Sequence, residues 1–273
     1  MSIRALLRSI AAAALAAACH AATAQALLLG VSEGTSGGLD HAQVIAKYQG
    51  LADTIGRAVR QKVEVVFVRE FEALEEGMKS GRFDFVMARP SDYPARGLRD
   101  YGYRYVASAK PDGQCFIVVP KGSPIKSLAE AKGKRFVIPE QISYMSKFCR
   151  AELRDRGIEL DKQRVQYVRE QGAVAFYLEN GFGDIGGLAS YSGPARSWEK
   201  NGNIVLHKSV TQPYFPLIAN KRMGDAQVGA VQRALKSLPS DESGRAVLKS
   251  VGVNEFDVGT ETKLRELLKW LGV

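Results

Sequence analysis

Short apolar segments alternate with helical patterns along this chain, and no other feature of the sequence restricts the fold as strongly. Residues 27–31, 63–68 and 83–88 read as strands, and helical patterns occupy residues 40–59 and 70–80 between them. Strands that alternate with helices are typical of a parallel sheet with helices packed on both faces. The first part of the chain is therefore predicted to form an α/β layer.

A second series of the same kind follows. Its predicted elements are the strands 115–119, 135–138, 165–168 and 184–187 and the helices 144–156 and 172–180. Extended segments at 103–109 and 212–216 flank this series, and we interpret them as two crossings between lobes. Three helices finish the chain. The sequence thus predicts one lobe from residues 27–109 plus 214–273 and a second lobe from residues 110–213.

Residues 1–26 have the pattern of a secretory signal peptide. Arg4 and Arg8 precede an Ala/Leu run that ends in AQA, which predicts export and cleavage after residue 26. The aliphatic residue before Cys19 lies one place too far upstream for lipoprotein processing, so we do not expect a lipid anchor. No later stretch approaches the ~20 apolar residues that a membrane span needs.

The mature chain is basic. Removing residues 1–26 takes away Arg4 and Arg8 and no acidic residue, which lowers the formal net charge from +9 to +7. A charge of this size suits an anionic ligand, or it simply keeps the protein soluble. Because Lys and Arg are scattered and form no basic run, we expect no nucleic-acid partner.

Two cysteines remain after cleavage, Cys115 and Cys149, in a compartment where disulfides persist. Cys115 lies in the predicted strand CFIVV, and Cys149 lies on the helix that follows the neighbouring strand. The sequence leaves two alternatives open, which are one disulfide or two separately buried thiols. Since no CxxC or HExxH motif exists and only His41 and His207 remain, we expect no zinc site.

The start of the helix predicted at residues 144–156 is a candidate anion site. The buried strand 135–138 leads into it, and Ser143 stands at the N-cap position. Free N–H groups and the helix dipole both favour negative charge at such a position. The alternative is that Ser143 only caps its helix, which serines do with or without a ligand.

Several short motifs point to one protein family. They are Tyr48-x-x-Leu51-Ala52 on the first helix, DFVMA at residues 84–88, SPIxSLAxxKGKR at residues 123–135, and the spacing of Ala173, Gly181, Asp184 and Gly186. Together with the export signal, they resemble the periplasmic phosphate/phosphite/phosphonate-binding proteins of ABC transporters. The resemblance spans essentially the whole mature chain.

This resemblance implies a type II periplasmic binding fold, in which two doubly wound α/β lobes are joined by a two-segment hinge and close on a ligand. It implies a periplasmic substrate-binding protein of an ABC importer and not an enzyme. The expected ligand is a small phosphonate- or phosphite-like oxyanion or a related organic anion, and the expected partner is an ABC permease in the inner membrane. We expect no cofactor and a monomeric protein.

The resemblance also implies where the anion binds. Family members have a Ser-x-Ser-Gly turn at this helix start, whose hydroxyl and N–H groups hold the phosphono oxygens. This chain has Ser143, Tyr144 and Ser146 there and no glycine. We expect these three residues to bind the ligand, and the Tyr144 ring adds a hydroxyl donor or a stacking face that suits an organic anion.

Further candidates follow the predicted strands, because ligands of α/β proteins bind beyond the carboxyl ends of strands. They are Thr35 and Ser36 after the first strand, Arg89 and Tyr93 after the third, and Ser190 and Tyr191 after strand 184–187. Arg89 would bind a carboxylate or phosphonate through bidentate contacts. Each has a structural alternative, since tyrosines pack beneath loops and an arginine beside a proline turn is often solvated. Glu33 could instead bind an amine of a zwitterionic ligand.

Two other functions stay open. Residues 34–38 satisfy the G-x-S-x-G pattern, so Ser36 could be the nucleophile of a secreted serine hydrolase with His207 as a distant base. Against this, a nucleophile elbow needs a helix directly after the serine and an HGGG-type oxyanion motif, and the sequence has neither. The second alternative is a binding protein that signals through a membrane partner.

Overall fold

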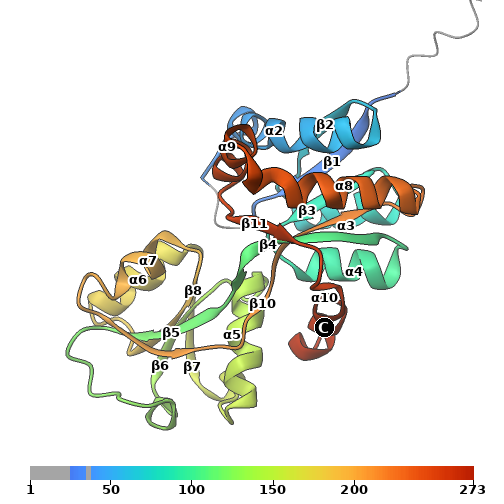
Figure 1. The fold of residues 1–273 in the computed structure, drawn as a ribbon. Helices are drawn as coiled ribbons and strands as arrows, with labels where there is room; N and C mark the ends of the chain where they lie inside the picture. The colour runs from blue at the N-terminus through green and yellow to red at the C-terminus, as the bar shows by residue number, and fades with distance from the viewer. Residues whose placement is uncertain (1–24, 35–37) are drawn as a thin grey trace, which may run out of the picture.

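The computed structural model describes residues 25–34 and 38–273. In this part of the chain, two sheets with flanking helices form two lobes that are joined by long strands (Figure 1). Nearly all of the predicted signal peptide, including Cys19, lies outside the described residues, as do Thr35 and Ser36. No helix of the described part has the length and apolar character needed to cross a membrane.

The first lobe is built on a six-stranded sheet with the order β11-β4-β10-β3-β1-β2. These strands are β1 (Leu27–Ser32), β2 (Val63–Phe67), β3 (Phe85–Ala88), β4 (Arg104–Gly113), β10 (Gln212–Ala219) and β11 (Glu255–Asp257). β1 pairs in parallel with β2 and β3, whereas β10 runs antiparallel to β3 and β4. The parallel pairing confirms the α/β layer predicted from the alternating pattern.

The second lobe is built on a five-stranded sheet with the order β7-β6-β8-β5-β9. Its strands are β5 (Cys115–Val119), β6 (Arg135–Pro139), β7 (Arg164–Val168), β8 (Ile185–Ala189) and β9 (Ile204–Lys208). β6 is parallel to β7 and β8, and β5 is antiparallel to β8 and β9. The carboxyl ends of β6 and β8 therefore lie at the same edge of this sheet, where each strand continues into a helix.

Helices cover both faces of each sheet. On the first lobe, α2 (His41–Val59), α8 (Asp225–Ser237) and α9 (Glu242–Val251) share one core, and α3 (Phe71–Lys79), α4 (Asp92–Asp100) and α10 (Glu261–Leu271) share the other. On the second lobe, α5 (Tyr144–Asp155) covers one face, and α6 (Gln171–Glu179) and α7 (Gly193–Trp198) cover the opposite face. This layering is that of doubly wound α/β lobes.

The strand β3 shows why its sequence is apolar throughout. Phe85 and Met87 pack in the core beneath α2, while Val86 and Ala88 pack in the core on the other face. Side chains alternate between the two faces of a strand, so a strand covered on both sides has no position for a polar residue. β3 thus ends in the interior of the protein, directly before Arg89.

Helix α4 is not among the elements predicted from the sequence, which leave the residues between strand 83–88 and the extended segment 103–109 without an assigned helix. Two residues that are unfavourable in helices obscure the helical pattern in this part of the sequence. Pro94 stands in the first turn, where the missing N–H costs no hydrogen bond. Gly97 packs so closely on β10 that a Cβ atom there would lie 2.5 Å from the Ile218 side chain. Here tertiary packing requires a residue that is unfavourable in isolated helices.

The last helix, α10, contacts both lobes (Figure 1). Its leucines pack in the same core as α4 of the first lobe. On the other side, the Trp270 ring meets the Phe148 ring of α5 edge to face, with centroids 4.9 Å apart. The Trp270 indole N–H donates to the Asp155 carboxylate at 2.8 Å. The chain terminus therefore holds α5 against the first lobe.

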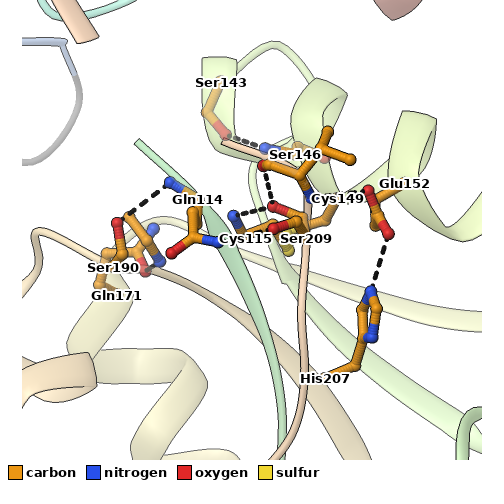
Figure 2. The surroundings of a disulfide bond; sticks show 12 residues. Gln114, Cys115, Ser143, Ser146, Cys149, Glu152, Gln171, Ser190, His207 and Ser209 are labelled. Atoms are coloured by element: carbon orange, nitrogen blue, oxygen red, sulfur yellow. Dashed lines mark hydrogen bonds and ion pairs between the residues drawn. A yellow bond between two sulfur atoms is a disulfide. The ribbon is translucent and has the colours of Figure 1, made fainter. Parts of the chain in front are cut away.

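A disulfide joins Cys115 of β5 to Cys149 of α5, with the two Cα atoms 5.3 Å apart (Figure 2). Of the two alternatives that the sequence leaves open, the structure has the bridge. Both cysteines are fully buried. Cys149 lies six residues after Ser143, less than two helical turns, so the bridge fixes the start of α5 relative to the sheet.

Breaking this bridge should destabilise the protein. The cysteines are 34 residues apart in the sequence, and closing a loop of that size in the unfolded chain is worth about 3 to 4 kcal/mol. We expect the variant Cys115→Ala/Cys149→Ala to lose about that much free energy of unfolding in urea titrations. Wild type treated with dithiothreitol separates the cross-link from the cavities left by alanine. Equal urea midpoints for oxidised and reduced wild type would contradict this prediction.

Candidate functional site

A small pocket, which we call the inner pocket, lies between the two lobes and has a volume of 20 Å³. The first lobe contributes Glu33, Gly34, Phe71, Arg89 and Pro90, and the second contributes Ser143, Tyr144, Met145, Gln171 and Tyr191. Five of the residues singled out in the sequence therefore meet here, namely Glu33, Arg89, Ser143, Tyr144 and Tyr191. They come from the ends of β1, β3, β6 and β8, as expected for ligands bound at the carboxyl ends of strands.

The start of α5 forms one wall of the inner pocket. Ser143 is the N-cap, and its Oγ accepts a hydrogen bond from the Ser146 N–H at 3.2 Å (Figure 2). The next two N–H groups, those of Tyr144 and Met145, have no hydrogen-bond acceptor among the described residues. Helix starts leave such donors unsatisfied unless a cap, water or a ligand accepts from them. Ser143 thus caps its helix, and it leaves two backbone donors beside the pocket.

Two buried hydroxyl groups lie near this wall. Neither the Tyr144 hydroxyl nor the Ser146 Oγ makes a hydrogen bond of normal geometry in the described part of the chain, although the Ser91 side chain lies close enough to the Tyr144 hydroxyl to lower its pKa against the larger effect of burial. Leaving a buried polar group unpaired costs about 1 to 3 kcal/mol. Burial raises the pKa of Tyr144 well above its ordinary value, so this hydroxyl keeps its proton at neutral pH. Ser146 is 1% exposed and lies behind the pocket wall.

Arg89 forms the opposite wall, and it is held by a buried acid. Its guanidinium lies 3.0 Å from Glu33, which also accepts from Lys47 at 2.7 Å and from the Tyr48 hydroxyl. Burial alone would raise the pKa of Glu33, but the charge of Arg89 and the hydrogen bonds from Lys47 and Tyr48 lower it below its ordinary value. Glu33 is therefore a carboxylate that orients Arg89.

Aromatic rings surround the Arg89 guanidinium. Its Cζ lies 5.2 Å from the centre of the Phe215 ring, 5.9 Å from that of Tyr191 and 6.0 Å from that of Tyr214. Tyr191 and Tyr214 are themselves stacked, with centroids 4.4 Å apart. Such rings favour a cation and exclude water from it. The Arg89 Nε is buried and has no partner among the described residues.

Tyr93 and Ser190 do not line the inner pocket. Tyr93 lies on α4 and stacks on Phe71, a pocket residue, at 5.3 Å. Burial, with a smaller contribution from the Asp92 carboxylate, raises the pKa of Tyr93 to about 12. The Ser190 Oγ accepts from the Gln114 N–H at 3.0 Å and so links the first crossing to the end of β8 (Figure 2). Tyr93 therefore packs against a pocket residue and Ser190 precedes the pocket residue Tyr191, but neither lines the pocket itself.

An ion pair joins the lobes next to the pocket. Lys147 of α5 donates to Asp92 of α4 at 2.7 Å, and the Asp92 side chain is fully buried. The second carboxylate oxygen of Asp92 has no partner among the described residues. This pair holds the first turns of α4 and α5 together across the lobe boundary.

Sequence reasoning missed several pocket residues. Phe71 and Gln171 are first residues of helices, at α3 and α6, and nothing in their local sequence separates them from ordinary helix starts. The Gln171 side chain accepts from the Ala189 N–H at 2.9 Å, a contact between segments 18 residues apart. Their position after β2 and β7 is the one signal that could have identified them. Within the described residues, no cluster of His, Cys, Asp and Glu could hold a metal ion.

Replacing Glu33 should destabilise the protein in a pH-dependent way. The variant Glu33→Gln leaves Arg89 and Lys47 without their counter-charge, which we expect to cost about 3 kcal/mol at pH 7. Because the pKa of Glu33 is lowered by folding, its contribution is complete above the ordinary value of 4.5 and is lost as the pH falls through the lowered value. Urea unfolding at pH 7 and pH 3 measures both effects.

A control for this prediction is Glu64→Gln, which breaks the exposed pair of Glu64 with Lys62. Exposed pairs contribute about 0 to 1 kcal/mol, so this variant should differ little from wild type at either pH. A loss for Glu33→Gln that is the same at pH 7 and pH 3 would contradict the assigned charge of Glu33.

The architecture is similar to that of solved binding proteins. A Xanthomonas citri protein, solved with chloride ion and with ATP, is 18% identical with a TM-score of 0.72 over 90% of this chain and 97% of its own. PhnD1 from Prochlorococcus marinus, in complex with methylphosphonate, is 14% identical with a TM-score of 0.67 over 90% and 97%. The periplasmic aliphatic sulphonate binding protein SsuA from Escherichia coli is 18% identical with a TM-score of 0.58 over 90% and 79%. These similarities confirm the predicted type II periplasmic binding fold.

The structural similarities above show the fold, and a match to a sequence model of one protein family shows the family as well. Residues 38–264 match the family described as "ABC transporter, phosphonate, periplasmic substrate-binding protein". Members of this family bind a transported substrate and are not enzymes, so the hydrolase considered for Ser36 is set aside. Most of the chain lies within the match, which includes the crossings and all helices from α2 to α9. The chain therefore belongs to the periplasmic substrate-binding proteins of phosphonate ABC transporters.

Proposed function

We propose that this protein binds a small oxyanion of the phosphonate class in the inner pocket and delivers it to an ABC permease. The observation that carries this proposal is the start of α5, where the N–H groups of Tyr144 and Met145 lack acceptors among the described residues. Free N–H groups at a helix start, with the positive end of the helix dipole, favour an anion. The family match supports the same choice.

Arg89 would hold the anion from the opposite lobe. Glu33 occupies part of the guanidinium, and the buried Nε without a partner is a further donor. Hydrogen bonds between charged groups are about twice as strong as those between neutral groups. An oxyanion between Arg89 and the α5 start would therefore join the two lobes through its own oxygen atoms.

The unpaired hydroxyl groups explain why an oxyanion fits better than a neutral ligand. The Tyr144 hydroxyl is a protonated donor at neutral pH, and Tyr144 lines the pocket. A phosphonate has three acceptor oxygens, which can accept from backbone N–H groups, a hydroxyl and a guanidinium at once. Thr35 and Ser36, outside the described residues, stay predicted ligands from the first lobe.

Ligand entry requires the lobes to separate. The inner pocket of 20 Å³ is only slightly larger than the 10–15 Å³ that one water needs, and the Lys147–Asp92 pair links α5 of one lobe to α4 of the other. We propose a hinge motion in the β4–β5 and β9–β10 connections, between a unit of residues 27–109 plus 214–273 and a unit of residues 110–213. Because α10 contacts α5, it would have to slide on that helix as the lobes open.

The ligands named for the similar structures support an anion here. Chloride, ATP and methylphosphonate are all negatively charged. At 14 to 18% identity these proteins share the fold with this chain, and the choice among anions depends on the residues that line its own pocket.

We expect Tyr144→Phe to weaken methylphosphonate binding without reducing stability. Losing a hydrogen bond to a charged group costs about 1.5 to 3 kcal/mol, equivalent to roughly ten- to a hundredfold in Kd. The ligand-free variant should melt at or above the wild-type temperature, because the hydroxyl has no partner to lose among the described residues. Ser143→Ala should lower both affinity and stability, the latter by about 0.5 to 2 kcal/mol, since it also removes the helix cap.

Isothermal titration calorimetry and thermal melting measure these two quantities. Tyr177→Phe on α6 is a matched control, because Tyr177 lies outside the inner pocket and should change neither result. Kd values within twofold of wild type for both Tyr144→Phe and Ser143→Ala would place the ligand elsewhere. No heat and no melting shift with methylphosphonate, phosphite, phosphate or ethanesulfonate at millimolar concentration would contradict the proposed function.

A further inference from the structure

A second, larger cavity adjoins the inner pocket. We call it the outer cavity. Its volume is 590 Å³, within the range of small-molecule sites. Three residues, Arg89, Gln171 and Tyr191, line both spaces, so the two spaces adjoin each other at these side chains. A ligand held in the inner pocket would therefore extend into the outer cavity with whatever substituent it carries.

The outer cavity is lined by arginines from both lobes. Arg69 follows β2 and Arg89 follows β3 in the first lobe, whereas Arg169 follows β7 and Arg196 lies on α7 in the second. Successive positions in this set are 20, 80 and 27 residues apart in the sequence, and folding alone brings them together. Glu170 is the acidic residue among the lining residues.

Most of this positive charge is uncompensated. Of the four arginines, Arg89 is the one with a carboxylate within 4 Å among the described residues. Arg196 donates to the Tyr191 carbonyl oxygen at 2.6 Å, and Arg69 lies 3.4 Å from the Leu39 carbonyl oxygen. Neither contact neutralises a charge. Three cations therefore face one carboxylate, that of Glu170, around a space large enough for a ligand.

The inner pocket differs in this respect. Its positive charge, on Arg89, is paired with Glu33, and its remaining donors are neutral N–H and hydroxyl groups. Such a pocket can take one compact anionic group. A cluster of guanidinium groups is suited to a second one, because arginine binds carboxylate and phosphate oxygens through paired N–H groups.

We propose that the preferred substrate of this protein is a phosphonate whose organic substituent carries a second anionic group, bound in the outer cavity by Arg69, Arg169 and Arg196. This inference rests on the proposed function, since it assumes a phosphono group in the inner pocket. The second group is a carboxylate or a further phosphoryl group at the end of a short chain. A neutral alkyl substituent gains nothing from the arginines.

The test compares two ligands of matched length. 3-Phosphonopropionate and propylphosphonate have the same three-carbon chain, and they differ in the terminal carboxylate. We expect 3-phosphonopropionate to bind about tenfold more tightly in calorimetry at low ionic strength, with a smaller difference at 0.5 M salt, because exposed charges are screened. The variant Arg69→Gln/Arg169→Gln, which keeps Arg196, should remove most of the difference and leave methylphosphonate affinity within twofold of wild type.

Arg233→Gln on the exposed face of α8 is the control for a general loss of positive charge, and it should keep the preference. Equal binding of the two matched ligands by wild type would overturn the inference while the proposed function stands. A preference that is undiminished in Arg69→Gln/Arg169→Gln would also overturn it, because the carboxylate would then be bound elsewhere. If methylphosphonate, propylphosphonate and 3-phosphonopropionate all fail to bind, the proposed function fails and this inference with it.

Discussion

The fixed position of helix α5 is the constraint on which the site depends. The Cys115–Cys149 bridge holds the helix to β5. On another side, the buried Glu152 accepts from the Val210 N–H at 3.2 Å and from His207 at 2.7 Å, which ties the helix to the second crossing (Figure 2). From the first lobe, Trp270 packs on its middle turn. The N–H groups at its start are thereby held in place before any ligand arrives, which reduces the entropy that binding must overcome.

The inner pocket and the outer cavity differ in how far their positive charges are paired with acidic residues. Next to the inner pocket each acid has a cation, since Glu33 is paired with Arg89 and Lys47, and Asp92 with Lys147. An anion there is stabilised by oriented donors more than by net charge. In the outer cavity, the arginines exceed the acids. The oriented donors of the inner pocket would therefore select the compact phosphono group of the ligand. The net positive charge of the outer cavity would select the substituent that this group carries.

Much of the fold could be predicted from the sequence, because it is encoded locally. The strands and most helices follow from apolar spacing, and the Ser143 cap follows from its position after strand β6. Helix α4 could not be predicted in this way, because Pro94 in its first turn obscures the helical pattern and Gly97 is explained only by packing on β10. The sequence could not decide between a disulfide and two free thiols at Cys115 and Cys149, since the distance between them depends on how α5 packs on β5.

The site was less accessible to sequence reasoning than the fold. Arg89 and Tyr144 could be identified because each directly follows a predicted strand or cap. The pairing of Arg89 with Glu33 spans 56 residues, and it converts Glu33 from a candidate amine ligand into the group that orients Arg89. The arginines of the outer cavity are single residues in four separate loops or helices, and a search for basic runs cannot detect them.

Amide chemical shifts on ¹⁵N-labelled protein, recorded during a titration with methylphosphonate, test most directly whether the anion binds at the start of α5. A hydrogen bond to an anion moves an amide proton strongly downfield. We predict that the amide resonances of Tyr144 and Met145 show the largest downfield shifts in the protein. Binding of methylphosphonate that leaves these two resonances in place, with the largest changes elsewhere in the cleft, would contradict an anion site at the start of α5.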